Sequence, residues 1–385
     1  MEVIEIPRPE FGSHLSDVIL KLEKLRAPVL HGTVPAAVFF QLKSVFHMLE
    51  TLGSARIEGN NTTLADYVEA KLSDQETVSD PRKELDNIEA AISFIEETVD
   101  AETPINRAFI SELHKMITKD LVPPPSGEGS RNPGELRVID VSISGSGHTP
   151  PNTMVLEEHY EALLQLLGGD HPVSLQLLAV ALAHHRFAHI HPFDNGNGRV
   201  GRVLSYALLL KSGFNVKKGG RIINPSAVFY TDRDEYYRYL SAADSLQDET
   251  LLEWSEYYLD GLLDAIQKVD RLLSLQYIQK KVLSPALSQA LEYQRISKKD
   301  YQILVYLISK EGMAIKSEEL SKFGYDTSKQ KSNAISRMKN ADLIIPTKPG
   351  GRIYTIKILG KGILRDVIEI LKKDGFIAAS LENNH

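Results

Sequence analysis

A glycine-rich stretch joins two predicted helices: His191-Pro-Phe-Asp-Asn-Gly-Asn-Gly-Arg-Val-Gly-Arg202. The segment before it, residues 173–190, is almost continuously apolar and is predicted to be a buried helix. The segment after it is amphipathic as far as Lys211 and stops before Gly213. Residues 195–198 therefore form a tight loop that leads into the first turn of a helix.

The chemistry of this loop favours an anionic ligand. The first turn of a helix has unpaired backbone N–H groups and the positive end of the helix dipole, so residues 195–198 predict an anion site. Arg199 and Arg202 follow one turn apart on the same helix face, and two guanidinium groups placed in this way suit a polyphosphate. His191 stands at the entrance of the loop, where a neutral imidazole could accept a proton from an incoming hydroxyl.

The stretch resembles the signature of the Fic (filamentation induced by cAMP) family, which reads His-Pro-Phe-x-acidic-Gly-Asn-Gly-Arg-x-x-Arg. The chain matches every fixed position but one, and the preceding residues 181–190 are also similar to Fic sequences. The resemblance covers roughly residues 40–265. It implies a mainly α-helical Fic core and an enzyme that transfers AMP from ATP to a Ser, Thr or Tyr hydroxyl of a target protein, self-modification included. The spacing Gly196-x-Gly-x-x-Gly201 also matches the dinucleotide fingerprint, but that fingerprint follows a strand, whereas a helix precedes it here.

The resemblance implies a role for each site residue. His191 is the catalytic base, Phe193 anchors the loop, and Arg202 holds the γ-phosphate. The residues expected to bind ATP are Asn195, Gly196, Asn197, Gly198, Arg199, Arg202, Tyr236 and Tyr237. The two tyrosines would stack on the adenine, although tyrosines at helical spacing also occur in helix cores and at their rims.

One position departs from the family pattern. Asn195 stands where the family has Asp or Glu, the carboxylate that binds the Mg²⁺ bridging the ATP phosphates. An amide oxygen can ligate a hard cation without supplying charge, so we expect weaker Mg²⁺ binding and an altered transfer rate. Asp194 is the neighbouring carboxylate, and its side chain can point elsewhere.

A second motif lies upstream, in Ser54-Ala-Arg-Ile-Glu58-Gly59. Glu58 is predicted in the last turn of a helix over residues 35–58, where the helix dipole disfavours a negative charge unless a cation pairs with it. In Fic proteins the pattern Ser/Thr-x-x-x-Glu-Gly/Asn is inhibitory. The resemblance implies that Glu58 pairs with Arg202 and keeps it from the γ-phosphate, with Ser54 one turn earlier as the second motif residue. The alternative is a solvated glutamate beside a helix cap.

A hairpin is predicted between these motifs. Residues 138–143 alternate apolar side chains and a Gly-rich turn follows at residues 144–147. The resemblance implies that this hairpin is the flap over the active site, which aligns a target segment by strand addition. An ordinary surface hairpin would have the same sequence pattern.

The C-terminal part has a different charge. Residues 296–360 contain 12 Lys and Arg against 6 Asp and Glu, although the whole chain has a net charge of −7. Three predicted helices and a Gly-tipped hairpin indicate a winged helix-turn-helix. Its helix over residues 327–340 has an inner stripe of Ala334, Ile335 and Met338 and outward basic side chains, which are Lys329, Lys331, Arg337 and Lys339. This surface predicts DNA binding, and protein docking is the alternative.

Composition gives the class and the domain plan. The 385 residues are 42% hydrophobic and 25% charged and include no cysteine, as in a globular protein without disulfides. The N-terminus has no signal-peptide pattern, and the polar residues within the apolar segment 173–190 indicate a core helix and no membrane span, so we expect a cytoplasmic protein. The predicted parts are an N-terminal helical region (1–100) with the inhibitory helix, a Fic core (101–265), a helical linker (266–295), the winged helix (296–360), and a C-terminal helix and tail (361–385).

Two classes of function follow from the sequence. The first is a self-inhibited protein adenylyltransferase, and homodimers are common among Fic proteins with N-terminal inhibitory motifs. The second is a DNA-bound or partner-bound regulator whose nucleotide site, weakened by Asn195, senses ATP. A third stays within Fic chemistry: removal of AMP, or use of another phosphate-containing donor.

Overall fold

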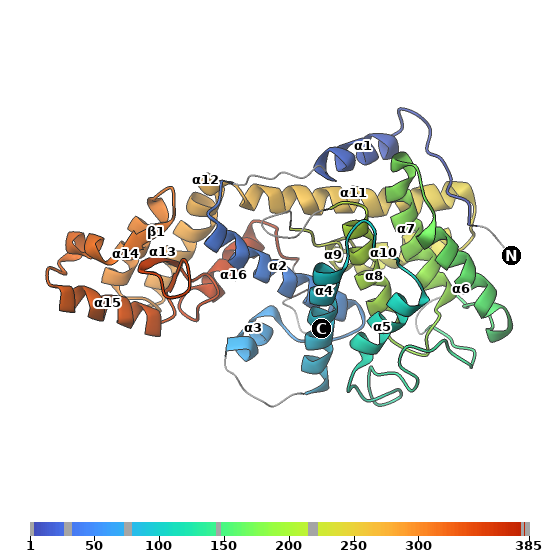
Figure 1. The fold of residues 1–385 in the computed structure, drawn as a ribbon, viewed down its shortest axis with the longest axis horizontal. Coiled ribbons are helices and arrows are strands. Elements are labelled where there is room, and N and C mark those ends of the chain that lie inside the picture. The colour runs from blue at the N-terminus through green and yellow to red at the C-terminus, as the bar shows by residue number, and fades with distance from the viewer. Residues whose placement is uncertain are drawn as a thin grey trace.

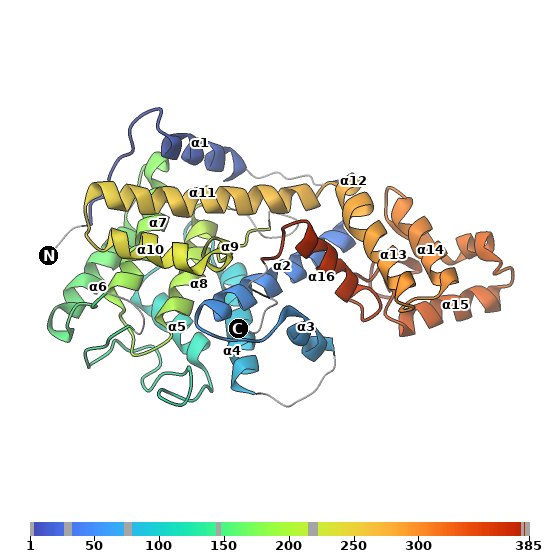
Figure 2. The ribbon, with the colours of Figure 1, turned by 180° about the vertical axis from the view of Figure 1, so that it is seen from behind.

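The structure is a computed structural model that describes residues 4–26, 33–72, 79–143, 148–214, 222–378 and Leu381. Within them the fold is mainly α-helical, as predicted, with a small sheet near the C-terminus. Figures 1 and 2 show an elongated molecule in which α5–α8 and α13–α15 lie at opposite ends and α2 lies between them. The helices up to the glycine-rich loop and beyond it are α1 His14–Arg26, α2 Ala36–Ile57, α3 Leu64–Leu72, α4 Asp80–Thr98, α5 Arg107–Thr118, α6 Thr153–Gly168, α7 Val173–Ile190, α8 Asn197–Lys211, α9 Ala227–Thr231, α10 Arg233–Ala243 and α11 Asp248–Leu272.

The apolar periodicity and the capping residues of the sequence also predict helices over residues 14–26, 82–98, 105–119, 153–168 and 233–243. Most of the helices begin and end within two residues of the predicted bounds. The sequence also predicts one long helix over residues 249–280, and this prediction is wrong in its second half. α11 ends at Leu272, and Ser274 has extended backbone (φ −77°, ψ 121°). The short α12 (Leu275–Tyr277) and a π-helical turn (Ile278–Leu283) follow. The Thr33 hydroxyl accepts the N–H of Leu275 at 2.8 Å, a bond from a distant segment that no local pattern reveals.

α7 is the buried helix that the sequence predicted. It packs against α8, α6 and α11, and its side chains from Leu177 to Phe187 are all buried. α8 is buried along nearly its whole length, including Arg199 and Arg202, each about 1% exposed. A helix that carries two buried arginines needs anionic partners nearby, and these determine the site.

The prediction of a hairpin strand at residues 138–143 is wrong. Residues 138–143 form no strand, and the predicted turn at 144–147 lies outside the described residues. Val138 and Ile139 are 78% and 58% exposed, so these apolar side chains do not pack on the core as one face of a strand would. Instead the Arg137 guanidinium binds the Ile139 carbonyl at 3.1 Å, which occupies a backbone acceptor that a strand partner would need.

The C-terminal part contains α13 Ser284–Glu292, α14 Lys298–Ser309, a 3₁₀ segment Ser317–Phe323, α15 Ser328–Asn340 and α16 Leu364–Lys373. Strands β1 (Ala314–Lys316), β2 (Ile344–Pro346) and β3 (Ile353–Ile356) form an antiparallel sheet in the order β1-β3-β2, in which Ala314 pairs with Thr355 and Ile344 with Ile356. This element order is compatible with the winged helix, which stays a prediction. Sequence analysis missed β1, as it missed α3 and α9, because each is short.

α2 contacts this C-terminal part. The Gln41 side chain of α2 donates to the Ile356 carbonyl at 3.0 Å and accepts the N–H of Ile358 at 2.7 Å. Among the described residues, every helix is too short or too polar to cross a membrane.

Candidate active site

The glycine-rich loop is held between two left-handed residues. α7 ends at His191, whose φ is 50°, and α8 begins after Gly196, whose φ is 75°. A Cβ at Gly196 would also lie 3.1 Å from the Thr118 methyl group, so this position needs glycine for both reasons. The loop therefore leads directly into the N-terminus of α8, as the anion-site prediction requires.

The interior of the loop is fixed by Asn197 and Phe193. The Asn197 amide accepts the Phe193 N–H and donates to the Phe193 carbonyl, both at 2.9 Å. The Phe193 ring is buried and stacks on His114 with ring centroids 3.8 Å apart. The side chain of Asn197 therefore shapes the loop through these two bonds.

His191 is oriented as a proton acceptor. Its Nδ1 lies 3.4 Å from the Ala188 carbonyl, which can only accept, so Nδ1 carries the proton and Nε2 has the lone pair that can accept one. Burial lowers the pKa of His191 to about 4, which keeps the imidazole neutral. The His191 carbonyl is bound by Arg137 Nε at 2.8 Å, which fixes the backbone at the loop entrance.

The second arginine of the motif is fully engaged by the upstream motif. Arg202 Nε donates to the Ser54 hydroxyl at 2.9 Å, and Nη2 donates to the Ser54 carbonyl at 2.8 Å and to Glu58 Oε1 at 2.6 Å. The structure thus brings Arg202 together with Ser54 and Glu58, which lie more than 140 residues earlier in the sequence. Ser54 binds the arginine itself from the last turn of α2, and Glu58 is the residue that directly follows this helix.

Glu58 also lies against the first turn of α8. A Cβ built on Gly198 would stand 2.0 Å from Glu58 Oε1. Burial alone would raise the pKa of Glu58, but Arg202 and Arg199 together hold the pKa below its ordinary value, so the group is a carboxylate. It places a negative charge at the helix N-terminus where an anionic ligand was predicted.

The first arginine of the motif has acidic partners of its own. Arg199 Nη1 binds Glu84 Oε1 on α4 at 2.9 Å, and Nη2 binds the Glu128 carbonyl at 2.7 Å. Glu84 is 3% exposed, and its second oxygen accepts from Asn60, two residues after Glu58. Burial raises the pKa of Glu84 despite the nearby Arg199. Both phosphate-type arginines are therefore paired with carboxylates in this structure.

The loop offers no free carboxylate for Mg²⁺. Both oxygens of Asp194 are bound, one by the Ser130 hydroxyl at 2.6 Å and the other by the Arg131 N–H at 2.9 Å. Asn195 donates its amide N–H to the Gly129 carbonyl at 3.0 Å. The side chains of Asp194 and Asn195 therefore do not fit a Mg²⁺ ion held by the protein, because Mg²⁺ prefers charged oxygen ligands.

The two tyrosines are not equivalent. Tyr236 is 3% exposed, and its hydroxyl lies 3.1 Å from Nε2 of His184, so it is a core residue. Tyr237 is partly exposed, and its pKa, raised mainly by burial, also responds to the charges of Glu58 and Arg202. The pKa of Tyr236, raised mainly by burial, also responds to Arg202, so both tyrosines lie near the arginine and they differ in their exposure.

Sequence reasoning missed three residues that hold the site: Arg137, His114 and Glu84. Arg137 is 4% exposed and bonds backbone carbonyls on both sides of His191; His114 fixes the Asn195 carbonyl at 3.1 Å. Each of these three residues stands outside any recognisable sequence motif. The only available signal was indirect: two arginines on a buried helix require acids from elsewhere.

The loop, the helix that follows it and the two paired arginines lie together on a helical core. Residues 104–209 match the Fic/DOC family and form a Fic/DOC family domain, as the sequence resemblance indicated. Among curated proteins, the chain is similar to Protein adenylyltransferase Fic of Drosophila ananassae, with 28% identity over 201 residues. That match covers 51% of this chain and 36% of the relative, so the chain spans about a third of the relative's length.

Solved structures show the same fold. A Fic family protein from Desulfovibrio desulfuricans superposes with a TM-score of 0.54 at 20% identity, covering 91% of this chain and 98% of the other. A Fic domain containing signaling protein from Bacteroides thetaiotaomicron gives a TM-score of 0.52 at 18% identity, covering 68% of this chain and 98% of the other. At these identities the likeness concerns the fold alone.

Proposed function

We propose that this chain is a protein adenylyltransferase that transfers AMP from ATP to a target hydroxyl and is held inactive by Glu58. The observation that carries the proposal is the three-bond attachment of Arg202 to Ser54 and Glu58, directly beside the N-terminus of α8. An arginine that served only stability would not need to lie at a predicted phosphate site. The position of Arg202 therefore supports a contact that ATP has to displace.

The chemistry assigns one step to each group. The target hydroxyl loses its proton to Nε2 of His191, and its oxygen forms a bond to the α-phosphorus of ATP. The bond from that phosphorus to the bridging oxygen breaks, and pyrophosphate leaves. The N–H groups at the start of α8, with Arg199 and Arg202, stabilise the negative charge on the phosphates. Both arginines must first exchange their carboxylate partners for phosphate.

The experiment is self-labelling and target labelling with α-labelled ATP. Glu58→Gly protein should incorporate label, the wild type much less, and Glu58→Gly with His191→Ala none, because a general base contributes roughly 10²–10⁴-fold. Since His191 lies at the loop entrance, ATP binding should survive His191→Ala. Equal labelling with and without His191 would contradict its assignment as the base. Replacing ATP by AMP-modified protein tests the removal of AMP.

A second candidate, a DNA-binding regulator, is favoured by α15. Its inner stripe Ala334, Ile335 and Met338 is buried as predicted, and Lys329 and Lys339 are exposed. Arg337 is exposed as predicted, and its guanidinium also binds both carboxylate oxygens of Asp300 on α14 at 2.6 Å.

DNA binding by the full chain should weaken steeply with salt, with a log–log slope near −0.9 per phosphate neutralised. Changing Lys329 and Lys339 to Glu should abolish binding, whereas Glu311→Gln on the same part of the chain should not weaken it. Absence of a gel shift with any duplex at low salt would favour protein docking.

A further inference from the structure

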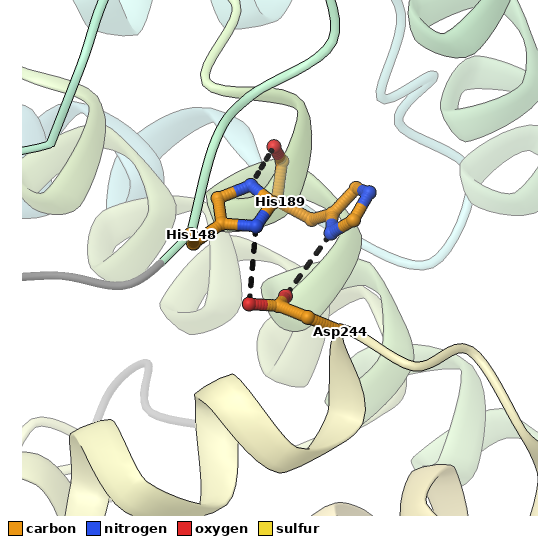
Figure 3. A group of neighbouring side chains, drawn as sticks. All are labelled: His148, His189 and Asp244. Atoms are coloured by element: carbon orange, nitrogen blue, oxygen red, sulfur yellow. Dashed lines mark hydrogen bonds and ion pairs between the residues drawn. The ribbon is translucent and has the colours of Figure 1, made fainter.

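A cluster of histidines around one carboxylate lies outside the phosphate site. Asp244 follows α10, and three ring nitrogens surround it: His148 Nδ1 at 3.1 Å from Oδ2, His189 Nδ1 at 3.0 Å from Oδ1, and His185 Nε2 at 3.1 Å from Oδ1. Figure 3 shows the rings of His148 and His189 directed at the two oxygens of Asp244. Nothing in the adenylyl-transfer chemistry uses these groups.

The ligand atoms have the spacing of a metal site. One atom each from His148, His189 and Asp244 lies within 4.8 Å of the others. Metal–nitrogen distances of about 2.0–2.1 Å place tetrahedral ligands about 3.3 Å apart, so the nitrogen–oxygen distances of 3.0–3.1 Å need only small adjustments. Two imidazoles and one carboxylate are a common ligand set for a divalent transition metal.

The surrounding bonds orient these ligands. His148 uses its other ring nitrogen, Nε2, to donate to the His189 carbonyl at 2.8 Å, which leaves Nδ1 directed at Asp244. The fully buried His185 donates to Asp244 Oδ1 and leaves Oδ2 facing His148. Metal-binding histidines and carboxylates usually have such supporting hydrogen bonds.

The cluster is partly exposed to solvent. The side chains of His148, His189 and Asp244 are 10%, 14% and 20% exposed, which allows water to reach the cluster. The three ligands come from the segment before α6, from α7 and from the end of α10, so an ion would join three elements that the polypeptide connects only distantly.

We propose that His148, His189 and Asp244 bind a divalent transition-metal ion, of which Zn²⁺ is the representative, with His185 positioning the carboxylate. Mg²⁺ is excluded as the occupant because two of the three ligands are nitrogens, and Mg²⁺ binds oxygen. The ion fastens the segment around His148 to α7, two residues before His191.

The test is Zn²⁺ titration by calorimetry of the chelator-treated full chain without nucleotide, so its outcome is independent of adenylyl transfer. The wild type should bind one ion per chain. His148→Gln and His189→Gln should each weaken binding by at least about tenfold, and His185→Gln by about 10–100-fold, the range for supporting residues. Zn²⁺ should raise the Tm of the wild type and not that of His148→Gln.

His14→Gln is the matched control, because His14 also lies beside a carboxylate, Asp260 at 3.4 Å, but without further ligands. It should leave Zn²⁺ binding unchanged, and excess Mg²⁺ should not compete. Co²⁺ bound in place of Zn²⁺ should show the visible absorption of a four-coordinate ion. If the wild type binds no Zn²⁺, or if the His148→Gln and His189→Gln double variant binds it as tightly as the wild type, the cluster is a hydrogen-bonded network and the proposal fails.

Discussion

Glu58→Gln removes one charge from the contact between Glu58 and Arg202 while keeping the size of the side chain. The bond from Arg202 Nη2 to Glu58 Oε1 is 2.6 Å long, Arg202 is 1% exposed and Glu58 is 28% exposed at its side chain. A hydrogen bond between charged groups in such a setting contributes about 1.5–3 kcal/mol. Since about 1.4 kcal/mol corresponds to a factor of ten, a ligand that must displace Glu58 should bind roughly 10–100-fold more tightly to the variant.

The assay compares ATP with ADP by calorimetry. If Glu58 competes with the γ-phosphate for Arg202, Glu58→Gln should tighten ATP binding by that factor and ADP binding much less. Asp264→Asn is the control, because Asp264 forms an exposed pair with Lys268 and its loss removes one charge elsewhere. Neither nucleotide should respond to it, since exposed pairs contribute little.

The refuting result comes from a double variant. Arg202→Ala removes the group for which Glu58 and ATP compete, so in that background Glu58→Gln should have no effect on ATP binding, and Glu58→Gly should not raise labelling. If either change still acts without Arg202, Glu58 works through another contact, for which the anion position at Gly198 is the first candidate. An equal gain for ADP and ATP would likewise contradict competition for the γ-phosphate.

Three further predictions concern the neighbouring residues. Glu84→Gln leaves the buried guanidinium of Arg199 short of charge, and urea unfolding should show a loss of about 3–5 kcal/mol; a loss below 1 kcal/mol would mean that Glu128 suffices. Burial raises the pKa of Glu50 from 4.5 to about 7, so the folded state keeps the proton between these two pH values while the unfolded state loses it. The extra free energy of unfolding is therefore fully present below pH 4.5 and is lost as the pH rises through 7. Glu50→Gln should remove that loss, about 3 kcal/mol, and unfolding curves at pH 5 and pH 8 check it; parallel pH dependences would exclude it. Asn195→Asp adds a charged oxygen to the loop and should lower the Mg²⁺ concentration needed for activity, whereas an unchanged Mg²⁺ titration would show that the ATP phosphates alone hold the ion.

Local chemistry in the sequence determined the elements and the loop. The apolar run 173–190 could only be a buried helix, and Gly196 permits the left-handed turn that starts α8 at Asn197. The pairing of Glu58 with Arg202 was expected from the family resemblance and from an acid at a helix C-terminus. These inferences held because they depend on residues within one or two turns of each other, or on a motif long enough to be specific.

Only the tertiary structure decided which side chains bind one another. The two bonds between Asn197 and Phe193 and the burial of Tyr236 could not be read from the sequence, and their place at a nucleotide stays a prediction. Nothing in the sequence connects Arg199 with Glu84, 115 residues away, because a single buried ion pair leaves no periodic trace. The same holds for His148 and Asp244: the distance between them depends on how the segment before α6 packs against α7 and α10, and that packing is a property of the whole core.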